Sequence, residues 1–275
     1  MKIIDAHIHF SNIGVFADTA EIYSGAKYSA KGLLAECADN DIAGLVAMGL
    51  SENSRYGFPD NETNGPMGCD LPGAPPFMKI CWGINPHRTD LKKLEALLPD
   101  AAGIKIYAGY YHFNVCDPVY DPVYKLAAKY NKPVVIHTGD TFSERGLLEY
   151  SHPLHVDRLA YNYRDVRFII AHIGTPWVMD ACEVVYKNRN VYTDISGLLT
   201  GEPAGIEKVT ESEPLILNLY RQGLTYLDSY KKVLFGTDWP LAAMKPYIGF
   251  CKTLIPEEHW PEVFYGNAAA LFEFN

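Results

Sequence analysis

Eight short apolar segments recur along the chain, and this repetition constrains the fold more than any other feature of the sequence. Amphipathic helical patterns lie between most of them, and strands that alternate with helices pair in parallel within one sheet. Parallel strands are covered on both faces, so each reads as a nearly continuous run of β-branched and other apolar residues. The segments begin near Lys2, Ile42, Lys79, Ala101, Pro133, Arg167, Val191 and Lys232.

A closed barrel accommodates eight such units better than an open sheet does. The chain has 275 residues, and roughly 250 residues are typical of a (β/α)₈ barrel. Neither Gly-x-Gly-x-x-Gly nor a phosphate-binding P-loop motif occurs, which weakens the alternative of an open nucleotide-binding sheet. The sequence therefore predicts an α/β protein folded as a single (β/α)₈ TIM barrel domain over residues 1–275.

Polar dipeptides predict where several helices begin. Residues 89–90 (Thr-Asp) supply caps, and residues 121–122 (Asp-Pro) match the residue preferences of the N-cap and of the first helical position. Residues 175–176 (Thr-Pro) have the same form after the sixth strand. Two connections, residues 51–78 and 197–209, are long and lack a regular pattern. Both follow strand C-termini, so we expect them to form walls or lids of a pocket.

Composition limits the classes of partner. The net charge of −9 and the pI near 5.5 argue against nucleic acid or an anionic membrane as a main partner, because both require basic surfaces. No apolar run approaches the roughly 18 residues of a membrane span. Six scattered cysteines without a Cys-x-x-Cys pair indicate reduced thiols and a cytoplasmic protein. We expect a small-molecule substrate, and the sequence leaves a homo-oligomer open.

The first apolar segment ends in two histidines separated by one residue. Side chains alternate along a strand, so His7 and His9 are expected on one face, with Ile4 and Ile8 on the other. Two adjacent imidazoles can bind one cation, at about 2.0–2.1 Å for zinc. Alone, the pair is equally compatible with ordinary histidines, so the metal hypothesis depends on further ligands.

Further metal-competent residues stand at the ends of three other segments. His137 ends the fifth segment, His172 the sixth and Asp238 the eighth. The C-terminal ends of barrel strands meet at one face, where enzymes of this fold place their active sites. Five such residues at four strand ends are poorly explained by chance. They therefore predict a metal site.

The chain resembles the amidohydrolase superfamily, whose signature has His-x-His on strand one, histidine on strands five and six, and aspartate on strand eight. The surrounding residues are similar to its amidohydrolase-related branch, which includes aminocarboxymuconate-semialdehyde decarboxylase. That branch contains hydrolases, decarboxylases, a hydratase and a metal-free lactonase, so the resemblance implies fold and metal more narrowly than substrate. The matching stretches are residues 5–9, 136–139, 171–174, 190–196, 235–240, 266–268 and 271–272.

The chemistry of each side chain suggests its role. His7, His9 and His137 suit Zn²⁺ as neutral imidazole ligands and leave a position for water. Asp238 could ligate the metal and accept a proton from that water, whose pKa the metal lowers toward ~7. By resemblance, His172 is an acid/base or carbonyl-polarising residue in one-metal members, and a ligand to a second ion in two-metal members. We expect one divalent ion in preference to two, with zinc favoured and manganese as the alternative.

Four residues are predicted to bind the substrate. Lys105 and Tyr107 share one face of the fourth strand, while Arg55 and Arg145 lie on loops at the same rim. A guanidinium matches a carboxylate in a two-pronged fork, so a carboxylate-bearing substrate is expected. Lys105 has two alternatives: a carboxylated lysine that bridges two metals, as in certain superfamily members, or a buried structural amine.

Three functions follow from these residues. The leading prediction is a metal-dependent hydrolase that uses activated water on a small, carboxylate-bearing ester, lactone or amide. The second is a metal-dependent, non-oxidative decarboxylase of a small organic acid. The third is a barrel that binds a small molecule without turnover. Asp238 argues against the third, because a binding pocket needs no carboxylate beside a metal.

Overall fold

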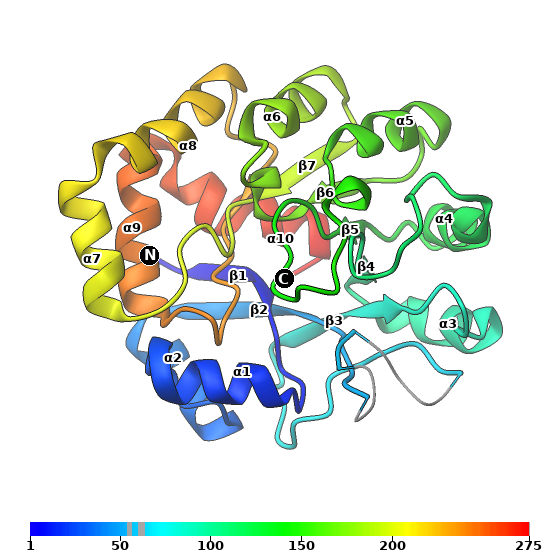
Figure 1. Ribbon diagram of the computed structural model, residues 1–275, viewed down its shortest axis with the longest axis horizontal. Helices are drawn as coiled ribbons and strands as arrows, with labels where there is room; N and C mark the ends of the chain where they lie inside the picture. The colour runs from blue at the N-terminus through cyan, green and yellow to red at the C-terminus, as the bar shows by residue number, and fades with distance from the viewer. Residues whose placement is uncertain (54–56, 60–63, 275) are drawn as a thin grey trace.

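The computed structural model describes residues 1–53, 57–59 and 64–274. Its eight strands form one parallel sheet in the order β1 to β8, so each strand lies beside the next along the chain (Figure 1). The strand positions agree with the eight apolar segments. The strands are β1 (Ile3–Ile8), β2 (Ile42–Met48), β3 (Met78–Ile84), β4 (Gly103–Ile106), β5 (Val134–Ile136), β6 (Phe168–Ile170), β7 (Val191–Asp194) and β8 (Val233–Leu234).

Backbone hydrogen bonds join β1 to the residues that follow Leu234 at the end of β8, and these bonds close the sheet into a barrel. The predicted (β/α)₈ barrel is therefore confirmed. The closing bonds run from Ala6 N–H to the Phe235 carbonyl (2.9 Å), from Asp238 N–H to the His7 carbonyl (2.8 Å) and from His9 N–H to the Trp239 carbonyl (2.7 Å).

Helices surround the strands, and α10 lies across the middle of the ring in the view of Figure 1. None of the helices in the described ranges is long and apolar enough to cross a membrane. The α-helices are α1 (Gly14–Thr19), α2 (Ala30–Asp39), α3 (Leu91–Leu97), α4 (Asp121–Lys129), α5 (Leu154–Asn162), α6 (Val178–Lys187), α7 (Pro203–Ser212), α8 (Pro214–Tyr226), α9 (Met244–Leu254) and α10 (Asn267–Phe272). Short 3₁₀ or π-helical segments are Ala20–Ser24, Leu98–Asp100, Pro118–Tyr120, Leu148–Tyr150, Ala171–Gly174, Glu257–His259 and Glu262–Gly266.

A β-bulge in β1 changes the expected alternation of side chains. Asp5 pairs with Leu45 and Ile8 pairs with Ala47, so β1 has one more residue than β2 over this stretch. Ile8 packs in the larger core cluster, on the side away from the histidines, as predicted. The prediction for Ile4 is wrong, because it packs inside the barrel, in a cluster with Val46, Cys81, Val135, Ile169, Leu234 and residues of α10. The bulge thus turns His7 inward above an apolar floor.

Of the three predicted helix starts, one is correct, one is displaced by a single residue and one is wrong. Asp90 caps α3, and its carboxylate accepts hydrogen bonds from the N–H groups of the second and third helical residues. Residues 121–122 lie one position further into α4 than predicted, because Asp117 already caps the preceding 3₁₀ turn. Thr175 is not a cap of α6; its hydroxyl donates to the His172 carbonyl (2.9 Å) instead.

The second long connection is more ordered than its sequence suggested. Helix α7 occupies residues 203–212, within and beyond the stretch expected to be irregular. Pro203 stands at the first helical position, where its missing N–H costs nothing and its fixed φ favours a helix. Ile206 is buried and anchors this helix. A second proline, Pro214, starts α8 two residues later.

Candidate metal site and surrounding pocket

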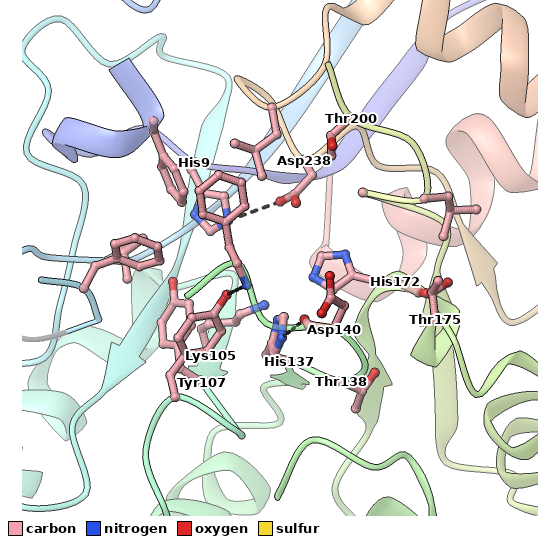
Figure 2. A pocket seen from close by; sticks show the side chains of 18 residues that line it. His9, Lys105, Tyr107, His137, Thr138, Asp140, His172, Thr175, Thr200 and Asp238 are labelled. Atoms are coloured by element: carbon pink, nitrogen blue, oxygen red, sulfur yellow. Dashed lines mark hydrogen bonds and ion pairs between the residues drawn. The ribbon is translucent and has the colours of Figure 1, made fainter. Parts of the chain in front are cut away.

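A cavity of about 260 Å³ opens at the C-terminal ends of the strands (Figure 2). The two long connections contribute Phe58, Leu198 and Thr200 to its walls, which confirms that they line a pocket. Figure 2 shows that several polar side chains point into one common space. These are His9, Lys105, His137, His172 and Asp238.

Three of the four predicted metal ligands form one compact cluster. His9 Nε2 lies 3.2 Å and His7 Nε2 lies 3.6 Å from Asp238 Oδ1. All three residues are buried, and they offer ligand atoms within 4.8 Å of one another. Asp238 Oδ1 is buried without a hydrogen-bond partner, although it contacts both rings. Two imidazole nitrogens and a carboxylate oxygen that converge in this way fit a divalent cation, so these residues could hold one.

Asp238 reaches this cluster from a strained backbone. Its φ is +64°, in the left-handed region that residues with a side chain rarely adopt. Hydrogen bonds to the His7 carbonyl and from Leu241 N–H hold this conformation. Burial raises the pKa of the Asp238 carboxyl, but the adjacent imidazoles of His9 and His172 outweigh burial and hold the pKa below its usual range. The carboxylate is therefore ionised at neutral pH.

His7 is held as a neutral imidazole. Burial, together with the Lys105 ammonium, lowers its pKa to about 3. Its Nδ1 lies 2.9 Å from Asp194 Oδ2, a carboxylate oxygen that can only accept, so Nδ1 carries the proton. The other nitrogen, Nε2, is then the unprotonated acceptor, and the Lys105 ammonium lies 3.4 Å from it. This Nε2 also faces Asp238, as a metal ligand requires.

His137, the fourth predicted ligand, lines the same cavity but lies outside the cluster. Its Nε2 is 2.8 Å from the Asp140 carbonyl and therefore donates to it (Figure 2). Its ring centroid is 5.1 Å from that of His172. Burial lowers the pKa of His137 well below its ordinary value, so this imidazole is neutral.

His172 lies between His7 and His137. Its ring centroid is 4.9 Å from that of His7, and His7, His172 and Asp194 form a second set of side chains with metal-ligand spacing. The ring is half-buried and borders the cavity, so it can exchange protons with a bound molecule. Its Nδ1 lies 3.0 Å from the Ser196 carbonyl, which leaves Nε2 as the nitrogen with the free lone pair.

Lys105 points into the floor of the cavity, as predicted. Only 1% of its surface is exposed, and its Nζ lies 3.4 Å from His7 Nε2 and 5.3 Å from the centroid of the Tyr107 ring. Burial lowers its pKa to about 8, so the amine is mostly charged at neutral pH. Within the described ranges, no carboxylate lies within ion-pair distance of Nζ.

The other predicted substrate-binding residues have different positions. The ring of Tyr107 lines the cavity, but its hydroxyl donates to the Gly49 carbonyl (2.9 Å). Arg145 borders a neighbouring cleft, on the far side of a wall formed by Phe58 and Tyr110. Arg55 lies outside the residues that the structure describes.

An aromatic wall on one side of the cavity was not foreseen from the sequence. Phe16 comes from α1, Phe58 from the loop after β2 and Phe142 from the loop after β5. Their ring centroids are 5.1 to 6.4 Å apart, and Phe16 also contacts the His9 ring. The three residues lie far apart in the sequence, and no periodic pattern links them. The cavity thus has an apolar wall next to a polar, metal-competent floor.

A family model described as amidohydrolase matches residues 4–274. The chain belongs to the amidohydrolase family. The resemblance inferred from the strand-end residues is therefore confirmed. None of the proteins of curated function matches this chain.

Several solved structures share the fold of this chain at low sequence identity. An uncharacterized TIM-barrel protein from Bordetella bronchiseptica is 18% identical, with a TM-score of 0.71 and 99% of each chain covered. A probable 2-pyrone-4,6-dicarboxylic acid hydrolase from Acinetobacter baumannii is 15% identical, with a TM-score of 0.65 and full coverage of both chains. A 5-carboxyvanillate decarboxylase from Sphingomonas paucimobilis is 15% identical, with a TM-score of 0.63, covering 100% of this chain and 99% of that one.

Proposed function

We propose that this amidohydrolase is a metal-dependent hydrolase of a small ester, lactone or amide that carries a carboxylate. The observation that carries the proposal is the buried convergence of His7 Nε2, His9 Nε2 and Asp238 Oδ1 beside the Lys105 ammonium. We further propose one divalent ion, zinc in preference to manganese, in a single-domain cytoplasmic enzyme. The cavity of about 260 Å³ supports a small substrate, because drug-sized ligands occupy roughly 300–1,000 Å³.

His7, His9 and Asp238 would hold the ion, and His137 is the further imidazole within the same cavity. A divalent ion supplies Lewis acidity, which polarises a carbonyl and makes water more acidic. The Asp238 carboxylate is ionised, so with Oδ1 on the ion its second oxygen is suited to accept a proton from water. The protonated Asp238 carboxyl could then give that proton to the leaving group, while His172, which borders the cavity with an unprotonated Nε2, is suited to accept a hydrogen bond or a proton from the bound molecule.

Lys105 would bind negative charge on the substrate. Its ammonium is buried beside the metal-competent cluster and lacks an ion pair with any described carboxylate, so an anionic oxygen there would be strongly favoured. The aromatic wall of Phe16, Phe58 and Phe142 would cover the apolar body of the substrate and exclude water. Tyr107 would contribute its ring to this pocket, since its hydroxyl is already bonded to Gly49.

Decarboxylation is the second candidate, and the position of Lys105 favours it. The cation stands at the floor of the cavity, next to His7, not at the outer rim. A substrate carboxylate drawn to this floor would lie beside the reacting centre, which is where a decarboxylase needs it. A hydrolase would instead use the same ammonium to stabilise the oxyanion that develops on the attacked carbonyl.

A substrate screen separates the two reactions. Protein purified without chelators would be assayed on aryl and aliphatic carboxylates and on their lactones, esters and amides, with carbon dioxide and hydrolysis products both measured. The metal content would be determined by elemental analysis of the same sample, with a chelator-treated and zinc-reconstituted sample as the control. We expect hydrolysis that is lost with the metal and restored by zinc. Carbon dioxide release without hydrolysis would establish the second candidate, and turnover by metal-free protein would refute both.

A further inference from the structure

Asp194 connects the two histidines that the metal site and the proton transfer require. It stands at the end of β7 with 1% of its surface exposed. Its Oδ2 lies 2.9 Å from His7 Nδ1. Its Oδ1 accepts from the His172 N–H (2.9 Å), from the Ser196 N–H (3.1 Å) and from the Ser196 hydroxyl (2.5 Å). Four donors thus meet on one buried carboxylate.

These bonds determine which nitrogen of each ring carries a proton. The carboxylate can only accept, so His7 donates from Nδ1. The Ser196 hydroxyl donates to Asp194 and lies 2.9 Å from His172 Nδ1, while the Ser196 carbonyl lies 3.0 Å from the same atom. Both oxygens therefore accept from His172 Nδ1. In each ring Nε2 is then the unprotonated nitrogen, and in His7 this atom lies 3.4 Å from the Lys105 ammonium, which can donate to it.

The backbone at His172 and Ile173 is strained, and a hydrogen bond to the Asp194 carboxylate helps to hold it. His172 and Ile173 have φ values of +59° and +44°, which residues with a side chain rarely adopt. The His172 N–H in this turn is bonded to Asp194 Oδ1. At Gly197 a Cβ would come within 2.9 Å of Asp238 Oδ2 and 3.0 Å of His172 Nδ1. The segment from Asp194 to Gly197 therefore lies against both His172 and Asp238.

We propose that Asp194, linked through Ser196, is a positioning residue that fixes the tautomer and orientation of His7 and His172. The purpose of this positioning, which is to prepare His7 for the metal and His172 for proton transfer, rests on the proposed function. A carboxylate that accepts from the distal nitrogen of a metal-binding histidine commonly changes metal affinity by about 10–100-fold when it is replaced. A purely structural role would instead affect stability without moving a proton from one ring nitrogen to the other.

Asp194→Asn tests the proposal at nearly constant volume. The amide oxygen can still accept from the His172 and Ser196 N–H groups, so the amide N–H₂ would face His7 Nδ1. An N–H donor there requires Nδ1 to accept, which moves the His7 proton to Nε2 and blocks the lone pair that faces Asp238. The direct readout is the tautomer, from ¹H–¹⁵N correlation spectra of the histidine rings in metal-free protein. The second readout is the zinc dissociation constant from chelator competition.

Two further variants act as controls. Thr193→Val removes a buried hydroxyl on the same strand, whose Oγ1 lies 2.8 Å from the Ile170 carbonyl and 3.2 Å from the Asp194 backbone carbonyl, and which is not bonded to the Asp194 carboxylate. It should lower stability and leave the tautomers and the zinc affinity unchanged. Ser196→Ala should disturb the His172 ring alone, because Asp194 still accepts from His7.

We expect wild-type His7 and His172 to be protonated at Nδ1, and Asp194→Asn to move the His7 proton and weaken zinc binding about 10–100-fold. Wild-type His7 protonated at Nε2 would overturn the proposal without any variant, even where Asp194→Asn fails to fold. An unchanged tautomer and affinity in a folded Asp194→Asn protein would overturn it too. The tautomers and zinc affinities test the positioning role alone. If they are as expected but turnover does not depend on metal, the proposed function is refuted and the positioning role stands.

Discussion

Replacing Lys105 with methionine should make the protein more stable and less active. Burial lowers the pKa of Lys105 from 10.5 to about 8, which corresponds to a cost of roughly 3 kcal/mol for the charged form. Methionine has a similar volume and no charge, so Lys105→Met removes this cost. We expect the free energy of unfolding of metal-free protein to rise, by up to about 3 kcal/mol. The measurement is urea denaturation at pH 7 in the presence of chelator.

The expected loss of activity follows from the interaction between the Lys105 ammonium and a substrate carboxylate. A carboxylate oxygen about 3–4 Å from Nζ interacts by roughly 4–5 kcal/mol at an effective dielectric constant near 20. Desolvation offsets part of this energy, which leaves about 1.5–3 kcal/mol for a charged hydrogen bond. Lys105→Met should therefore lower kcat/KM by roughly 10- to 150-fold on the best substrate of the screen.

Lys79→Met is the matched control for this experiment. Lys79 donates to the carbonyls of Phe272 (3.0 Å) and Glu273 (2.8 Å), next to the C-terminus and away from the cavity. It should lose a little stability and keep wild-type kinetics. A Lys105→Met protein that retains its metal and stays within twofold of wild-type kcat/KM would refute the substrate-binding role. Loss of the metal from Lys105→Met would instead support the carboxylated lysine.

Four further variants test the remaining roles. Asp238→Asn should keep much of the metal, measured by elemental analysis, and lose about 10²–10⁴-fold in kcat, the usual share of general acid–base assistance; near-normal turnover would make Asp238 a scaffold residue. His7→Ala and His9→Ala should both lose the metal, but in urea denaturation His7→Ala should cost about 1–3 kcal/mol more, because it leaves the buried Asp194 oxygen without its donor; equal costs would contradict this. Phe142→Ala should raise KM and leave kcat and metal content unchanged; an unaltered KM across the substrate screen would remove Phe142 from the binding wall.

The barrel was predictable from the sequence because its signal is repeated and local. Each parallel strand reads as an apolar run, and eight runs of this kind at helix-length spacing leave few alternative folds. The positions of residues at strand ends are predictable for the same reason, since the fold itself brings the C-terminal ends of the strands together. His7, His9 and Asp238 meet for this reason. Lys105 points into the same cavity for the same reason.

The parts that escaped prediction depend on single side-chain contacts or on loops. His137 stands at the expected strand end, yet its ring turns toward the Asp140 carbonyl, and no periodic pattern encodes that rotation. Arg145 lies on a loop at the rim, but the Phe58 ring separates it from the cavity. The aromatic wall is assembled from three loops or short helices, so its existence depends on how those segments fold over the barrel.

Asp194 illustrates a residue that was visible in the sequence and still received no role. It ends the seventh strand and lies within a stretch that matches the amidohydrolase-related branch. An aspartate at such a position is compatible with ligating the metal, activating water or orienting a neighbour, and only distances separate these roles. In the structure both carboxylate oxygens of Asp194 accept hydrogen bonds, at 2.5–3.1 Å, from His7, His172 and Ser196, which favours the orienting role.

The β1 bulge explains how one short strand serves both the core and the chemistry. A regular strand that placed Ile4 inside the barrel would also place Ala6 and Ile8 there, and both histidines would point toward the helices. The extra residue between Asp5 and Ile8 shifts the alternation by one. Ile4 and Ala6 therefore pack in the apolar layer inside the barrel, and the two imidazoles lie above this layer, toward the cavity. Asp5 stabilises the result: its carboxylate accepts from the N–H (3.0 Å) and the hydroxyl (2.6 Å) of Thr237, the residue before Asp238. The same irregularity that misled the strand pattern is therefore what brings His7 and Asp238 to one point.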